Sequence, residues 1–103
     1  MDKMFAVDGQ TLRILRAPDL ADAEVMQGIR QALQGMIDAA PGRITIDFSD
    51  AHALSSSIIG ITLLAVELGS HTQTAVSVHA PMRHHQALVA AGLTRLADLR
   101  LCG

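Results

Sequence analysis

Aromatic residues are almost missing from this sequence, which has no tryptophan, no tyrosine and only 2 phenylalanines among its 103 residues. Half of the residues are nevertheless hydrophobic. A core must therefore be built from leucine, isoleucine, valine, alanine and methionine, which suit thin layers of helix packed on sheet. A chain of this length buries roughly 65% of its unfolded surface. That is enough for a single domain over residues 1–103.

Cysteine, basic runs and long apolar segments are also scarce. Cys102 is the single cysteine, so no internal disulfide can form and a reducing, cytoplasmic location is expected. The net charge is −2 and lysines and arginines do not cluster, which argues against nucleic acid as a partner. The longest apolar run, Ile58 to Leu68, is interrupted by polar residues and has about half the length of a membrane span. Residues 1–4 lead into polar sequence without the apolar stretch of a secretory signal, so we expect a soluble protein.

Segments with strand and helix periodicity alternate along the chain. Asp8-Gly9 separates two short apolar arms, which is typical of a hairpin turn. Asp19 is the expected N-cap of a first helix that ends at Pro41-Gly42. The further expected elements are a strand over residues 43–49, a helix that closes at Gly69, a strand over residues 74–80, a helix from Pro81 to Gly92, and a final strand around Leu99 and Leu101. This order predicts an α/β fold with a largely parallel sheet and one antiparallel arm at its start.

Three segments together carry a resemblance to a known family. The strand Ile44-Thr45-Ile46-Asp47-Phe48-Ser49 is followed, after a short loop, by Leu54-Ser55-Ser56-Ser57-Ile58-Ile59-Gly60-Ile61-Thr62-Leu63-Leu64. Further on, Leu88-Val89-Ala90-Ala91-Gly92-Leu93 closes the third expected helix. This arrangement resembles the central motif and the Leu-x-x-x-Gly-Leu segment of the STAS family, the anti-sigma-factor antagonists. The resemblance covers nearly the whole chain and implies a four- to five-stranded mixed sheet with helices packed largely on one face.

The resemblance also implies a function, which is protein binding without catalysis and without a cofactor. Ser56 falls where family members carry the serine that is phosphorylated by a kinase-type anti-sigma factor. The family's aspartate before that serine is Ser55 here, and its glycine after the second serine is Ile58. The expected partner-binding residues are Ser55, Ser56, Ser57, Ile58, Ile61, Thr62 and Ala65.

The second expected helix is apolar nearly all round. Ile58, Ile61 and Ala65 cover one side, while Ile59 and Leu63 cover another. Full burial of such a helix is hard to arrange in a two-layer domain of this size. We therefore expect an exposed apolar patch that is covered by another protein, or by a second copy of the chain in a homodimer.

Other interpretations of these residues stay open. One of the three serines can simply cap the helix. The resemblance is also compatible with a small cytoplasmic subunit of an ABC-type lipid transporter, which would dock on the ATPase without phosphorylation. Asp47 and Asp50 flank the end of a strand, where α/β sheets often place ligands, but no nucleophile–base–orienter set accompanies them. The spacing of His52 from the loop serines does not support a catalytic dyad either. The 5 histidines lack the spacing of metal ligands, so we expect no metal site and a solvated position for each.

Overall fold

Strands and helices alternate along the chain in the computed structural model, which describes residues 4–102. Residues 1–3 lie outside the described residues. They belong to the N-terminal segment in which the sequence shows no apolar stretch typical of a secretory signal. The elements are β1 (Phe5–Asp8), β2 (Thr11–Ile14), α1 (Ala23–Asp38), β3 (Arg43–Asp47), α2 (Ser55–Ser70), β4 (Ala75–Pro81), the short 3-10 turn η1 (Met82–His84), α3 (His85–Ala90), the 3-10 turn η2 (Leu93–Arg95) and β5 (Asp98–Cys102). The expected order of strands and helices, and with it the α/β class, is confirmed.

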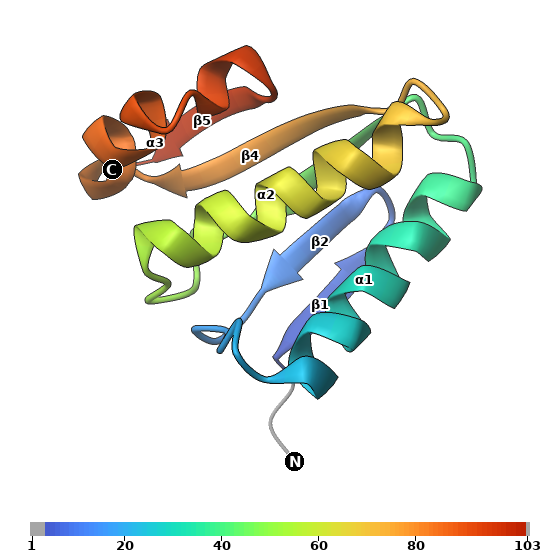
Figure 1. The fold of residues 1–103 in the computed structure, drawn as a ribbon, viewed down its shortest axis with the longest axis horizontal. Helices are drawn as coiled ribbons and strands as arrows, with labels where there is room; N and C mark the ends of the chain where they lie inside the picture. Colours follow the sequence, from blue (N-terminus) through green and yellow to red (C-terminus); the bar gives the residue numbers. More distant parts are fainter. Residues whose placement is uncertain (1–3, 103) are drawn as a thin grey trace.

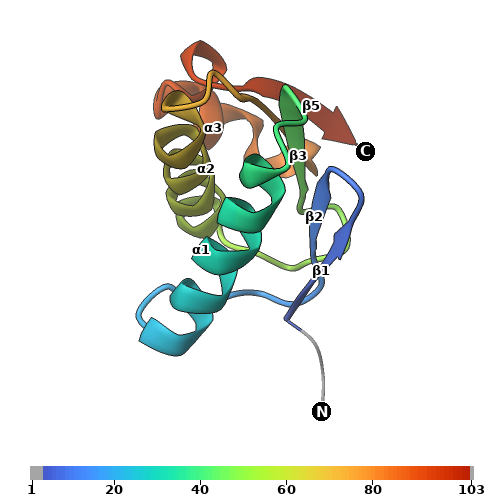
Figure 2. The ribbon, with the colours of Figure 1, turned by 90° about the vertical axis from the view of Figure 1, so that its right-hand side faces the viewer.

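The sheet keeps its five strands in sequence order, β1-β2-β3-β4-β5. β1 pairs antiparallel with β2, and every other pair of neighbours is parallel. Each parallel connection contains a helix, and α1, α2 and α3 all cover the same face of the sheet (Figures 1 and 2). The carboxyl ends of β2 to β5 therefore lie along one edge, where the loop to α2 and the turn η1 begin.

The start of α1 differs from the sequence-based expectation. Oδ1 of Asp22 accepts hydrogen bonds from the N–H groups of Glu24 at 3.0 Å and Val25 at 3.4 Å, so Asp22 is the N-cap. Asp19 instead accepts from the N–H of Ala21. The expectation that Asp19 is the cap is wrong, because the chain makes a further turn between Asp19 and Asp22, closed by a backbone bond of 3.0 Å.

The segment expected as one helix from Pro81 to Gly92 is divided. Pro81 is the last residue of β4, and η1 separates it from α3. The expectation of Pro81 in the first turn of the third helix is therefore wrong. Gly92 has a φ of 80° directly after the C-cap residue of α3, as expected for a glycine that ends a helix.

The core lies between the helix layer and one face of the sheet, and it is almost entirely aliphatic. Its largest fully buried side chains are Phe48, Leu12, Ile14, Ile29, Leu33, Ile37, Ile44, Ile46, Ile58, Ile61, Leu88 and Leu93. Side chains of a strand alternate between its two faces, so in β2 and β3 the residues next to the buried Leu12, Ile14, Ile44 and Ile46 point to the face away from the helices. Within residues 4–102, no helix is long and apolar enough to cross a membrane.

The opposite face of the sheet is polar. The strand register aligns Arg13, Asp47, His79 and Arg100 across β2, β3, β4 and β5. All four are half-buried or exposed. No helix of the described residues packs on this face (Figure 2).

Candidate functional site

Helix α2 packs on the sheet with the side that the sequence assigns to partner binding. Ile58, Ile61, Thr62 and Ala65 are all 0% exposed. The expected outward orientation of these four side chains is wrong. The small side chain of Ala65 lets the middle of α2 approach the sheet closely, so its branched neighbours fill the core there.

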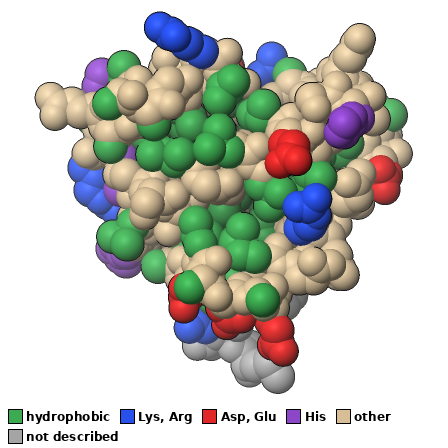
Figure 3. Space-filling model, viewed as in Figure 1, with side chains coloured by type: hydrophobic (Ala, Val, Ile, Leu, Met, Phe, Trp, Pro, Cys, Tyr) green, Lys and Arg blue, Asp and Glu red, His purple; other side chains and the backbone are tan. Residues whose placement is uncertain are grey.

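The solvent side of α2 carries a different set of residues. Ser56, Ile59 and Leu63 follow one another at three- and four-residue spacing and therefore share one face of the helix. Leu63 is 45% exposed, Ser56 is exposed and Ile59 is half-buried. Leu54, directly before α2, is 69% exposed, and Met82 in η1 is 54% exposed. We define the α2 rim as Leu54, Ser56, Ile59, Leu63 and Met82. Figure 3 shows hydrophobic side chains gathered along α2 on this face of the molecule.

A hydrogen bond joins the start of α2 to the 3-10 turn η1, which follows β4. The Oγ atom of Ser55 lies 2.6 Å from Nδ1 of His84. His84 is 7% exposed, so the expectation of a solvated side chain is wrong for this histidine. Burial lowers the pKa of His84, and the positive charge of Arg83 lowers it further, so the ring is neutral at pH 7. Leu54 directly precedes Ser55 and Met82 lies two residues before His84, so the bond keeps the two exposed residues near the same end of α2.

The three serines at the start of α2 have different environments. Ser55 is half-buried against His84, Ser57 is 5% exposed, and Ser56 is exposed to solvent. None of them caps the helix, because the N-cap position is Leu54 and no side chain makes a cap hydrogen bond there. The capping interpretation is therefore wrong, and Ser56 is the serine that another molecule can reach.

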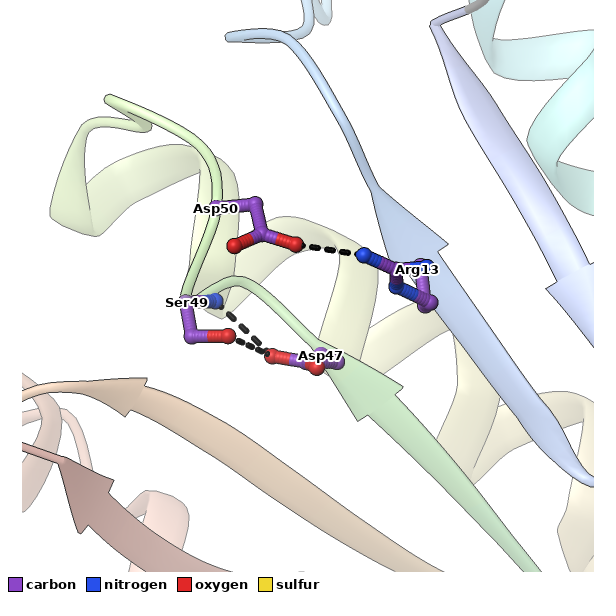
Figure 4. Close-up of polar contacts among 4 residues, drawn as sticks. All are labelled: Arg13, Asp47, Ser49 and Asp50. Atoms are coloured by element: carbon purple, nitrogen blue, oxygen red, sulfur yellow. Dashed lines mark hydrogen bonds and ion pairs between the residues drawn. The ribbon is translucent and has the colours of Figure 1, made fainter.

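The two carboxylates after β3 are engaged in the loop that leads to α2 (Figure 4). Oδ1 of Asp47 accepts from the N–H of Ser49 at 2.8 Å and from its hydroxyl at 2.6 Å. Oδ2 of Asp50 accepts from Nη2 of Arg13 at 2.7 Å, and this bond raises the pKa of Arg13. Both carboxylates thus shape the loop, and His52 is exposed beside them.

Neither a metal centre nor a large cavity coincides with the rim. Across residues 4–102, no three His, Cys, Asp or Glu side chains gather in a way that could hold a metal ion. A hollow of about 310 Å³ lies between α1 and α2, lined by Met26, Arg30 and Leu64 among others. The α2 rim is therefore an exposed surface, and none of its residues lines the hollow between α1 and α2.

Leu54, Met82 and His84 are the functional candidates that the sequence pattern does not identify. The one available signal is Leu54 itself, because an apolar residue stands where helices usually begin with serine, threonine, aspartate or asparagine. Met82 and His84 carry no such signal. Met82 is exposed and His84 is buried because the turn η1 interrupts the helix that the sequence predicts there.

The described residues form an α/β domain whose helices cover one face of a mixed sheet (Figure 2), and this fold is known from a solved structure. A solved structure from Thermotoga maritima, described as a "putative anti-sigma factor antagonist", matches with a TM-score of 0.67 and covers 95% of this chain and 85% of that one. The two sequences are 11% identical, so the likeness concerns the fold. No family model matches the sequence, and no curated protein matches it either. The fold implied by the STAS resemblance is confirmed.

Proposed function

We propose that this protein regulates another protein by binding it through the α2 rim, in the manner of an anti-sigma-factor antagonist. The proposed partner is a cytoplasmic, kinase-type anti-sigma factor, whose capture would free a sigma factor for transcription. The observation that carries the proposal is Leu54, which leaves 69% of its surface in solvent at the start of α2. A partner that covers this side chain and Leu63 gains the free energy of removing apolar surface from water.

The position of Leu54 strengthens the argument. Its backbone has the extended conformation of an N-cap, with φ of −77° and ψ of 153°, but its side chain cannot accept a hydrogen bond from the helix. A serine or aspartate there would stabilise the helix by about 1 kcal/mol relative to an apolar residue. Folding alone therefore disfavours leucine at this position, whereas docking of a partner accounts for it.

Phosphorylation of Ser56 is the regulatory part of the proposal. Ser56 is exposed within the rim, and the first turn of α2 contains no acidic residue. A phosphate adds a charge of about −1.5 to −2. The free N–H groups and the dipole of the helix start accommodate that charge, so the fold tolerates it. The same charge amid apolar side chains must lose its water when a partner docks, so binding weakens while folding does not.

The docking surface is tested with matched variants. The partner is first captured from the native cell on the purified protein, and its affinity is then measured by calorimetry. We expect Leu54→Asp to weaken binding at least about tenfold, because it replaces the most exposed apolar side chain of the rim with a charge that must lose its water in the contact. Val7→Asp is the control, because Val7 is also an exposed apolar residue, with 50% of its surface in solvent, but lies in the edge strand β1, away from the rim. Equal affinities of the wild type and Leu54→Asp would disprove docking at the rim.

The switch is tested separately with the captured kinase and ATP. We expect mass spectrometry to place phosphate on Ser56 and to find none on Ser56→Ala. An otherwise active kinase that leaves Ser55, Ser56 and Ser57 unmodified would remove the switch but not the docking surface.

The transporter role has less support from the structure than from the sequence. A permanent apolar interface with an ATPase would use Ile58, which replaces the glycine of the family motif, but Ile58 is 0% exposed in the core of the chain itself. Capture of an ABC-type ATPase that binds the rim without modifying Ser56 would nevertheless replace the anti-sigma partner.

A further inference from the structure

Strand β5 ends the sheet with an open edge. It pairs with β4 on one side and has no strand on the other within residues 4–102. Its half-buried Leu99 and Leu101 alternate with the exposed Asp98, Arg100 and Cys102. Unpaired N–H and C=O groups along such an edge can accept a further strand, and proteins commonly block this with lysine or proline. β5 contains neither residue.

We infer that β5 pairs antiparallel with β5 of a second copy of this chain, in a register centred on Leu99. A two-fold axis perpendicular to the sheet relates the copies and keeps both helix layers on the same side. Side chains alternate between faces, so the axis must pass through a residue position, which then opposes itself.

Charge selects the Leu99 position for that axis. With Leu99 opposite Leu99, Asp98 of each copy opposes Arg100 of the other on the polar face, and this ion pair occurs twice. With Arg100 opposite Arg100, like charges meet directly, which disfavours that register. Within one chain, Arg100 Nε lies 3.5 Å from Asp98 Oδ2 while both side chains stay at least 50% exposed. Asp98 Oδ2 also lies 3.8 Å from Nη1 of Arg43 in the same chain. In the proposed register Asp98 keeps that contact and exchanges only the Arg100 of its own chain for the Arg100 of the other copy.

The apolar side of β5 also favours this pairing. Leu99 and Leu101 are half-buried, so each keeps part of its aliphatic surface in solvent. In the proposed register Leu99 packs on Leu99 and Leu101 on Ala97 of the other copy. The pairing thus removes these aliphatic side chains from water on the face where the helices lie.

The other edge of the sheet lacks this complementarity. β1 runs from Phe5 to Asp8, and Asp8 is its only charged residue. A second β1 would bring no cation to face that carboxylate. β5 lies at the end of the sheet opposite to β1 (Figure 2). We expect its pairing to leave the α2 rim of each copy uncovered, because β5 pairs through its edge and α2 packs on the inner strand β4. The dimer would thus present two docking surfaces, and its existence does not depend on what binds them.

Charge reversal tests the pairing in solution. Sedimentation equilibrium gives the dimer dissociation constant of the wild type, of Arg100→Asp, and of the double variant Asp98→Arg/Arg100→Asp. The single variant places like charges opposite each other twice, so its dissociation constant should rise roughly tenfold. The double variant reverses both partners and should restore the wild-type value. A wild type that stays monomeric at millimolar concentration, or a double variant as weak as the single one, would overturn the inference.

Cysteine cross-linking tests the register. In a Cys102→Ser background, Leu99→Cys should form a disulfide-linked dimer on oxidation, because directly opposed Cβ atoms lie about 4.5–5.5 Å apart and a small shift of the edge strands brings them within disulfide range. Arg100→Cys, one position along on the other face, should remain monomeric on a non-reducing gel. Cross-linking through Arg100→Cys instead, or loss of the dimer in Leu54→Asp, would show that the copies meet in another way.

Discussion

Ser55 in the first turn of α2 and His84 at the end of η1 lie 29 residues apart in the sequence and are joined by a 2.6 Å contact between Oγ and Nδ1. The imidazole is almost completely buried, and its Nε2 atom has no hydrogen-bond partner among residues 4–102. A charged ring in this position would lose its hydration without gaining a second acceptor. The link between α2 and η1 therefore depends on a neutral histidine.

Stability should fall in mild acid because of His84. Its pKa is lowered in the folded state, so the unfolded chain binds the proton more tightly, and the free energy of unfolding decreases as the pH falls below about 6.5. Urea unfolding at pH 7.5 and pH 5.5 measures this loss. We expect a smaller loss for His84→Gln than for the wild type. His85→Gln, which changes an exposed neighbour, should keep the full loss, and an unchanged loss in His84→Gln would contradict the assignment.

Two glycines should respond to alanine in opposite ways. A Cβ atom at Gly35 meets nothing within 4 Å, so Gly35→Ala should stabilise α1 by about 0.5–1 kcal/mol through helix propensity. At Gly69 the added atom would lie 3.0 Å from the backbone oxygen of Thr74, which cannot move easily. Gly69→Ala should therefore destabilise the protein by about 1–3 kcal/mol. Thermal unfolding of the two variants side by side checks both signs.

Thr62 should be replaceable by valine with a gain in stability. Its side chain is 0% exposed, and its hydroxyl has no hydrogen-bond partner in the described part of the chain. Valine keeps the branched shape and removes the buried polar group, so Thr62→Val should raise the free energy of unfolding by about 1 kcal/mol. Thr94→Val, at an exposed position, serves as the control and should change little. A destabilised Thr62→Val would indicate that the hydroxyl is hydrogen-bonded after all.

Negative charge should have opposite effects at the two ends of α2. Ser56→Glu places a carboxylate in a first turn that has no acidic residue, and it should stabilise the fold by about 0.3–1 kcal/mol. Ser70→Glu places the same group at the last residue of the helix and should destabilise by a similar amount. Chemical unfolding at low and high salt checks both effects, which salt should reduce. A loss of stability in Ser56→Glu would mean that phosphorylation cannot leave the fold intact.

The strands can be predicted from the sequence because one face of the sheet is apolar and the other is polar. In β3, Ile44 and Ile46 alternate with Thr45 and Asp47, and the structure buries the first pair. Apolar residues then recur at every second position, which identifies the segment as a strand, and the order of strands and helices follows from such segments.

The burial of α2 cannot be predicted in the same way. The side with Ile58 and Ile61 and the side with Ile59 and Leu63 are similarly apolar, so periodicity does not show which one meets the sheet. The choice depends on the loop after β3 and on the Ser55–His84 bond, which are tertiary features. For the same reason the sequence does not tell which of two adjacent histidines, His84 or His85, is buried.

The strand order has a consequence for how the molecule can meet others. In doubly wound α/β folds, ligands enter a crevice where neighbouring connections depart to opposite sides of the sheet. Here the order runs from β1 to β5 without reversal and every helix returns on the same side, so no such crevice opens among the described strands. In this architecture a new binding function is therefore acquired more easily by substituting exposed side chains on its surface than by deepening a cleft.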